Sequence, residues 1–145
     1  MATKKKYSIK LKVIKIDKRG CQLTVAGKIN GKKAHLIIDS GASQTVFDKN
    51  RIEDFLGHNK FEKSKSFSSG LGTNSMESHL VKVPGLSVGN FEIKDEKMIL
   101  LDLSHVNESY QALKLKPVDG VIGGDILKRY KAVIDYGKKV ITFHL

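Results

Sequence analysis

An aspartate stands directly after an apolar run and directly before a Ser-Gly pair. Residues 36–38 are all aliphatic, Asp39 follows them, and Ser40 and Gly41 come next. The pattern predicts a carboxylate at the end of a buried strand, on a turn where glycine lets the backbone approach another group closely. A carboxylate there is costly unless it is paired, hydrogen-bonded or used in chemistry. The tripeptide alone is more typical of a turn aspartate that binds nearby backbone amides.

The chemistry that such an acid supports depends on a second carboxylate. Hydrolysis of an amide without a metal or a covalent nucleophile needs a base to activate water and an acid to protonate the leaving nitrogen. Two carboxylates that share one proton fill both roles, because like charges a few ångströms apart cannot both ionise. Asp135 resembles Asp39 but precedes a Lys-Lys tip, so we interpret it as a hairpin residue. The second acid would then be Asp39 of another subunit, across a two-fold axis.

The elements that must position Asp39 are mainly strands. Period-two alternation, apolar runs and turn residues predict strands at 7–16, 21–29, 32–39, 44–47, 78–83, 86–93, 97–101, 118–122, 132–136 and 140–145. Asn30-Gly31 predicts a tight hairpin turn. A helix is expected over 49–56, capped by Asp48 and ended by Gly57, and another over 126–130, opened by Asp125. The stretch 102–116 is ambiguous and partly helical, so the sequence predicts a mostly β chain with two short helices.

Length and composition limit the classes of protein. The 145 residues suggest a single domain over 1–145, with 1–6 as a disordered tail. Cys21 is the only cysteine, which favours a reducing compartment, and the absence of a signal-like segment favours the cytoplasm. No apolar run is long enough for a membrane helix. The net charge of +11 is spread along the chain, so solvated lysines are favoured over nucleic-acid binding. The five histidines lack metal-ligand spacing, so no metal site is expected.

A second motif, Gly120-Val121-Ile122-Gly123-Gly124-Asp125-Ile126-Leu127, follows Asp39-Ser40-Gly41-Ala42-Ser43 at a long distance in the chain. Together they resemble the signature segments of the retropepsin-like (clan AA) aspartic proteases, in particular bacterial single-domain members. The resemblance covers about residues 20–145. It implies the single-domain acid-protease fold, a closed or orthogonal β-barrel-like arrangement.

The resemblance also implies roles for particular residues. Asp39 would be the catalytic acid that activates water. Ser40 and Gly41 would support the active-site loop, with Ser40 bonding across a dimer. The stretch from about 67 to 79 would form a flap over the substrate. The substrate-binding residues would be Gly41, Ala42, Ser43, Ser69, Gly70, Leu71 and Gly72. Asp125 is interpreted as a helix cap.

Two functions follow from these expectations. The first is an aspartic endopeptidase that acts as a homodimer on a peptide or protein substrate, without metal or other cofactor. The second is a catalytically inactive module of the same fold that binds peptides or dimerises, because a fold alone does not give activity. The intact Asp39-Ser40-Gly41 favours the enzyme.

Overall fold

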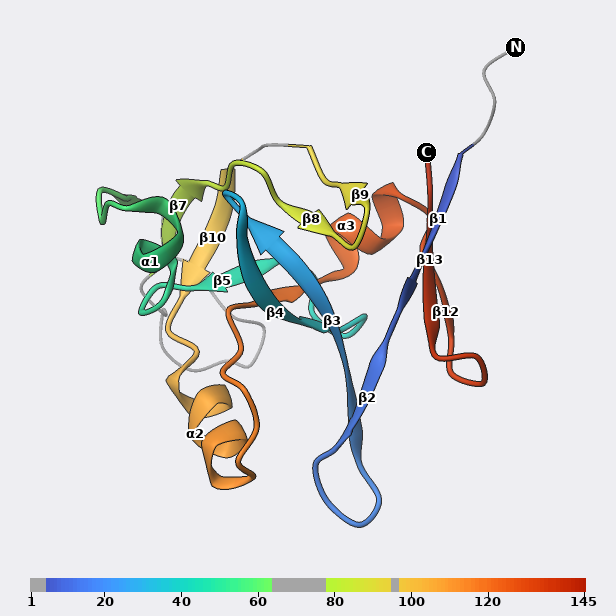
Figure 1. Ribbon diagram of the computed structural model, residues 1–145. Helices are drawn as coiled ribbons and strands as arrows, with labels where there is room; N and C mark the ends of the chain where they lie inside the picture. Colours follow the sequence, from blue (N-terminus) through green and yellow to red (C-terminus); the bar gives the residue numbers. More distant parts are fainter. Residues whose placement is uncertain (1–4, 64–77, 95–96) are drawn as a thin grey trace.

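The computed structural model describes residues 5–63, 78–94 and 97–145 (Figure 1). Thirteen strands and three helices lie in these ranges. The strands are β1 Lys6–Lys10, β2 Lys12–Lys15, β3 Cys21–Ile29, β4 Lys32–Ile38, β5 Val46–Asp48, β6 Glu62–Lys63, β7 His79–Lys82, β8 Ser87–Val88, β9 Phe91–Glu92, β10 Lys97–Leu101, β11 Gly120–Ile122, β12 Val133–Asp135 and β13 Val140–His144. The helices are α1 Ile52–Leu56, α2 Ser104–Ala112 and α3 Gly124–Arg129.

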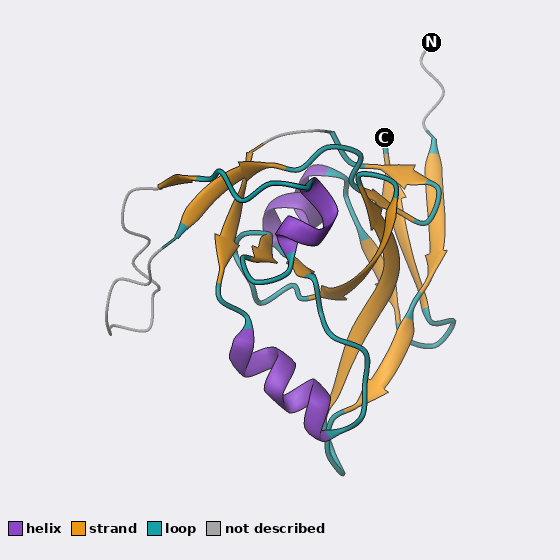
Figure 2. Ribbon diagram, turned by 60° about the vertical axis from the view of Figure 1, so that its left-hand side comes forward, coloured by secondary structure: helices purple, strands orange, loops and turns teal. Residues whose placement is uncertain are grey.

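The strands form two sheets. The larger one runs in the order β6-β7-β10-β5-β11-β4-β3-β8-β9, with β2 also paired to β3, and the smaller one is β1-β13-β12. Most pairs are antiparallel, but β11 lies parallel to β4 and β10 parallel to β5. Figure 2 shows the strands curling into a half-barrel. The predicted mostly β, barrel-like fold is therefore confirmed.

The β3–β4 hairpin is the longest pair in the fold and leads to Asp39. Its turn is Asn30-Gly31, with φ values of 51° and 80°, which are the positive angles that this residue pair tolerates. The register pairs Ile29 with Lys32 and continues to Leu23 opposite Ile38. The predicted turn and both predicted strands are confirmed, apart from one residue at the end of β4.

The N-terminal segment forms two strands where the sequence predicts one over 7–16. β1 pairs with β13 and β2 pairs with β3, so the chain changes sheet between them. At the change, the Leu11 amide donates to Lys139 O at 2.9 Å instead of continuing a ladder. β1 begins at Lys6, within the expected tail, and the Leu145 amide donates to Lys5 O at 2.9 Å. Residues 1–4 lie outside the described residues.

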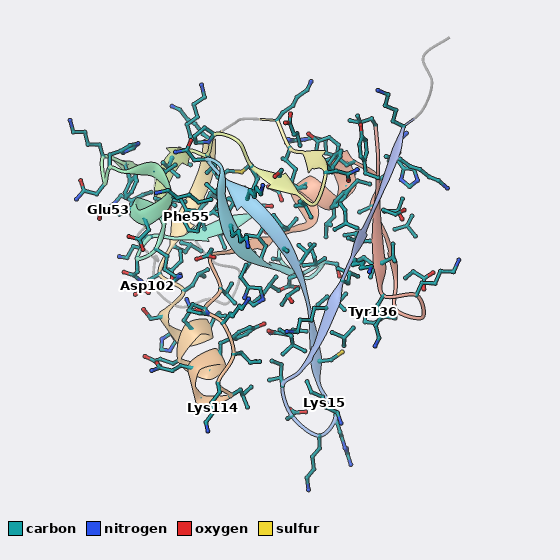
Figure 3. All side chains as sticks on the ribbon, in the orientation of Figure 1. Lys15, Glu53, Phe55, Asp102, Lys114 and Tyr136 are labelled. Carbon is teal, nitrogen blue, oxygen red and sulfur yellow. The ribbon has the colours of Figure 1, made fainter. Side chains whose placement is uncertain are left out.

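The number of helices differs from the prediction of two. The ambiguous stretch after β10 contains α2, so three helices occur in the described ranges. α1 is shorter than expected, and its N-cap is Arg51 instead of the predicted Asp48. The buried Asp48 carboxylate accepts from the Asn50 amide at 3.0 Å in the turn before the helix and from the Leu103 amide at 3.3 Å. The predicted end at Gly57 is confirmed, with a left-handed φ of 76°. On α1, Phe55 is buried while Glu53 faces outward (Figure 3).

Two hydrophobic clusters hold the elements in place. The larger cluster fills the space between the sheets, where the Phe91 ring stacks on Phe143 with centroids 4.8 Å apart. The smaller cluster includes Ile37, Val121 and Tyr110, and so joins β4 and β11 to α2. The strands on either side of Asp39 are therefore packed on both faces, as parallel strands usually are. In the described residues, no helix is long and apolar enough to cross a membrane.

Candidate active site

Asp39 lies where β4 ends, beside the end of β11. Because β4 and β11 are parallel and in register from Leu36 opposite Gly120, the Asp39 amide donates to Ile122 O at 3.0 Å. The Asp39 side chain is exposed, and its Oδ1 accepts a hydrogen bond from the Gly41 amide at 2.9 Å. Within the described residues, its other oxygen accepts no hydrogen bond and the carboxylate has no ion pair.

The backbone around Asp39 turns tightly. The Ala42 amide donates to Asp39 O at 3.2 Å, which closes a turn over Ser40 and Gly41. A Cβ atom at position 41 would lie 3.2 Å from Asp39 Oδ1, closer than most side-chain contacts. Glycine therefore leaves room for the carboxylate to take its hydrogen bond from the backbone.

The loop that carries Asp39 crosses over β11. β11 lies between β4 and β5 in the sheet, parallel to the first and antiparallel to the second. The loop from β4 to β5 therefore has to pass across the carboxyl end of β11. There, the Gly124 amide donates to Ala42 O at 2.7 Å and the Asp125 amide donates to Ser43 O at 3.2 Å. These bonds fix the loop to the first turn of α3.

A hydrogen-bonded pair of polar side chains, the buried Thr45 and the half-buried Asp125, strengthens this connection. The Thr45 hydroxyl donates to Asp125 Oδ1 at 2.7 Å and accepts from the Gly123 amide at 3.0 Å. The Thr45 amide donates to the same Asp125 oxygen at 2.9 Å. Thr45 is 1% exposed, so its polar atoms depend on these partners.

The interpretation of Asp125 as a helix cap is wrong. The N-cap of α3 is Gly123, which makes no side-chain cap bond, and Asp125 lies within the first turn of the helix. Its carboxylate accepts from Thr45 and from the Ile126 amide at 2.8 Å. The residue therefore ties the helix to the loop that carries Asp39. The local sequence could not indicate this, because Thr45 and Asp125 are 80 positions apart.

The other proposed site residues lie as follows. Ser40, Gly41 and Ser43 are exposed on the Asp39 loop, whereas Ala42 is half-buried against the smaller hydrophobic cluster. The proposed flap residues Ser69, Gly70, Leu71 and Gly72 lie outside the described residues.

The acids that could compete with Asp39 have other partners. Asp119 is 5% exposed; its Oδ1 accepts from Arg51 Nε at 2.7 Å and its Oδ2 from the His35 amide at 2.8 Å. Asp135 accepts from the Lys138 amide at 2.9 Å, as expected for a hairpin residue. Among the described residues, no three His, Cys, Asp or Glu side chains gather as a metal site would require.

Solved structures with a similar arrangement of strands include aspartic proteases. A retropepsin-like aspartic protease from Rickettsia conorii aligns at 17% identity with a TM-score of 0.57, over 99% of this chain and 96% of that chain. The retroviral protease-like domain of Ddi1 from Leishmania major aligns at 18% identity with a TM-score of 0.57, over 84% of this chain and 87% of that chain. The EIAV protease in complex with the inhibitor HBY-793 aligns at 17% identity with a TM-score of 0.52, over 82% of this chain and 97% of that chain. At these identities the likeness concerns the fold.

The sequence itself gives the family. A family model described as aspartyl protease matches residues 25–126, more than half of the chain, and the match includes the Asp39 loop and the segment through β11. The chain therefore belongs to the retropepsin-like aspartyl protease family, as the motifs predict. Among curated proteins, none matches the chain significantly.

Proposed function

We propose that this protein is an aspartic endopeptidase in which the Asp39 carboxylates of two identical subunits activate water. Membership of the aspartyl protease family supports the reaction class. The observation that carries the proposal is the state of Asp39: an exposed carboxylate, fixed through its backbone and through Oδ1, with Oδ2 free of partners among the described residues. The turn aspartates Asp17 and Asp135 also accept through Oδ1 alone, so the position of Asp39 distinguishes it: it lies at the end of β4, on the loop fixed across β11, within the family match.

The reaction follows from two such carboxylates at one axis. Two Asp39 side chains at hydrogen-bond distance would share one proton between them. The ionised carboxylate takes a proton from water as the water attacks the peptide carbonyl. The protonated carboxylate gives its proton to the substrate, first at the carbonyl oxygen. As the C–N bond breaks, the carboxyl that took the proton of water protonates the leaving nitrogen, and a hydroxyl of the gem-diol returns a proton to the other carboxylate. Each turnover therefore consumes one water and leaves one proton on the pair.

The peptide would lie across the two Asp39 loops in an extended conformation. Gly41 offers backbone groups to it, and Ala42 and Ser43 line the cleft in this proposal. Ser69, Gly70, Leu71 and Gly72 would cover the peptide as a flap, and Ser40 would bond across the dimer below the acids. The free Cys21 fits a reducing compartment, so the cytoplasm is the proposed location.

The test is the replacement Asp39→Asn, assayed on a peptide library that the wild-type protein cleaves. The amide keeps the shape but loses the base, so cleavage should fall at least about 10³-fold. Cleavage by the wild type should also stop with a statine-containing inhibitor such as pepstatin and persist in a chelator.

Asp17→Asn is the matched control. Asp17 is also an exposed turn aspartate whose Oδ1 accepts backbone amides, from Arg19 at 2.8 Å and Gly20 at 2.5 Å. This variant should cleave at the wild-type rate. If Asp39→Asn retained activity, the mechanism through Asp39 would be wrong. If the wild type cleaved no peptide at any pH or concentration, the protein would be the inactive module instead.

A further inference from the structure

A cavity of about 700 Å³ lies on the outer side of the β3–β4 hairpin. Exposed lysines from β1, β2, β3, β4 and the segment before β11 line it, and the small residues Thr24 and Ala26 lie between them. We call it the basic groove; its lysines are Lys10, Lys12, Lys28, Lys33 and Lys116. β4 runs from this groove to Asp39, and His35 in the groove is four residues before Asp39, roughly 13 Å along the strand.

The positive charge of the basic groove is not neutralised within the described residues. None of its five lysines makes a salt bridge there. The acid among the described lining residues is Asp119, which is already bound to Arg51 and to the His35 amide, with a side chain 6% exposed. The charges of Arg51 and Asp119 neutralise each other. The positive charges of the five lysines are therefore available to bind an external partner.

Two of these lysines oppose each other directly. Lys28 on β3 and Lys33 on β4 are register partners in the hairpin, and both side chains are exposed. Like charges directly opposite on a sheet destabilise the pair. The hairpin therefore carries an unfavourable contact that an anion between the two ammonium groups would relieve.

We propose that the basic groove binds an acidic peptide segment in an extended conformation. Carboxylates at alternate positions of such a segment lie on one face, where they meet the groove lysines, while the small residues between them point to the opposite face, away from the groove. Binding here needs no catalysis, so the inference stands apart from the proposed protease activity.

A peptide fits the described lining better than a single-stranded nucleic acid. Such nucleic acids bind by stacking bases on aromatic rings or arginine. No Phe, Tyr or Trp lines the described part of the basic groove, and Arg51 is committed through Nε to Asp119. The ring of His35 is held by Pro117 O, 3.1 Å from Nδ1. The described lining therefore offers a ligand lysine charges and small side chains, but no ring on which a base could stack.

The experiment measures binding of a fluorescein-labelled peptide of about eight alternating Glu and Ala residues by fluorescence anisotropy, at low and at physiological salt. The variant is Lys28→Gln/Lys33→Gln. The control, Lys18→Gln/Lys128→Gln, also lowers the net charge of +11 by two but changes exposed lysines outside the groove. An oligothymidylate and an alternating Lys-Ala peptide are the comparison probes.

The acidic peptide should bind the wild type, and its Kd should rise about five- to tenfold in Lys28→Gln/Lys33→Gln but less than about twofold in the control. With bound peptide, Lys28 and Lys33 should also react more slowly than Lys18 with an amine-acylating reagent, as mass spectrometry would report. Equal losses in both variants, or no binding, would overturn the proposal. Tighter binding of oligothymidylate that depends on Lys28 and Lys33 would make the groove a nucleic-acid site instead.

Discussion

At the scale of single residues, Thr45 supports the Asp39 loop through atoms that water does not reach. Thr45→Val keeps the volume but removes the hydroxyl, so the buried Gly123 amide loses its acceptor and Asp125 loses a donor. We expect the free energy of unfolding to fall by about 1–3 kcal/mol, since a buried polar group is then left unpaired. Urea denaturation measures this loss, and peptide cleavage should decrease with it.

Thr142→Val is the control for Thr45→Val. Its hydroxyl bonds to Ser8 Oγ at 3.0 Å on an exposed part of β13, where water replaces the lost partner. A change below about 0.5 kcal/mol is expected. Equal losses in the two variants would mean that the Thr45–Asp125 connection adds nothing beyond an ordinary surface hydrogen bond.

Asp102 is expected to make the stability of the fold depend on pH in the acid range. It lies at the start of α2 (Figure 3), where the Ser104 hydroxyl and amide and the Asn50 side-chain amide donate to it. These donors, Ser104 first, lower the pKa of Asp102 below its ordinary value of 3.8. The carboxylate therefore stabilises the fold above about pH 4, and this contribution is lost as pH falls through the lowered pKa. Asp102→Asn should flatten the acid side of a stability–pH curve from urea denaturation; curves of equal slope would contradict this.

The residues of the site were predictable where the signal is local. Asp39, Ser40 and Gly41 are adjacent in the chain, so an apolar run followed by this turn is visible in the sequence. The partnership of Thr45 with Asp125 spans 80 positions and depends on how β11 passes below the loop. In the sequence, the one indication was Thr45 itself, a polar residue next to the apolar Val46 and Phe47. That indication does not identify Asp125 as its partner.

At the scale of elements, the crossing of the Asp39 loop over β11 requires glycine at one position and not at the next. A Cβ on Gly123 would lie 2.7 Å from Gln44 O and 2.8 Å from Ala42 O, both backbone atoms of the loop. Gly123→Ala should therefore displace the loop, lower stability by about 1–3 kcal/mol and reduce cleavage strongly. Thermal or urea denaturation and peptide assays measure both effects.

Gly124→Ala is the matched control one residue later. Its Cβ would have Ala42 O as nearest neighbour at 3.4 Å, an ordinary contact, and alanine favours the helix α3 that begins there. Stability should equal the wild type or exceed it by up to about 1 kcal/mol, with activity retained. Equal damage from both substitutions would show that the close approach at Gly123 is not the cause.

In the β3–β4 hairpin, one substitution is expected to increase the stability of the protein. Lys28→Glu replaces the like-charged Lys28–Lys33 pair by an opposite-charged one, so stability should increase by about 0.2–1 kcal/mol. Lys12→Glu is the control, because Lys12 faces the uncharged Thr24 in the β2–β3 register. The increase from Lys12→Glu in urea denaturation should be smaller; an equal or larger increase would contradict the argument from register.

Element boundaries were predictable where turns fix them and not where tertiary contacts do. The Asn30-Gly31 turn and the strand Cys21–Ile29 depend on local preferences. The division of 7–16 at Leu11 depends on the Lys139 carbonyl, which no local pattern contains. The apolar–polar alternation of the sequence runs through Leu11 and breaks at Val13–Ile14, so it does not mark the position where the chain changes sheet.

At the scale of the whole molecule, alternation and turns predict a mostly β chain, but they do not predict how the sheet closes. The order β10-β5-β11-β4-β3 interleaves strands that are distant in the chain, and two of its pairs are parallel. The two motifs, taken together as a family resemblance, predicted the barrel-like acid-protease fold but not this strand order. α2 remained ambiguous because it has a single buried residue, Tyr110, and a weakly amphipathic pattern.

The proposed mechanism makes activity a property of two chains, because each chain supplies one Asp39. Specific activity should therefore rise with protein concentration and level off above the dimer dissociation constant. With a net charge of +11 on each chain, repulsion opposes association, so dimerisation should strengthen as salt increases from low to physiological concentration, where the Debye length is about 8 Å. Sedimentation velocity at several protein and salt concentrations, matched to peptide assays, measures both dependences.

Mixing with the inactive variant separates this assembly from a monomeric enzyme. Excess Asp39→Asn chain should inhibit the wild type by forming dimers with one carboxylate, and the matched excess of Asp17→Asn should increase activity instead. A monomer that cleaves peptide at constant specific activity would place the second carboxylate within the chain. Both oxygens of Asp119 and Oδ1 of Asp125 already accept hydrogen bonds, so either acid would have to give up its bond to Arg51 or Thr45 to serve in such an enzyme. The hydrogen bonds of Asp119 and Asp125 therefore support the proposal that a second subunit supplies the second acid.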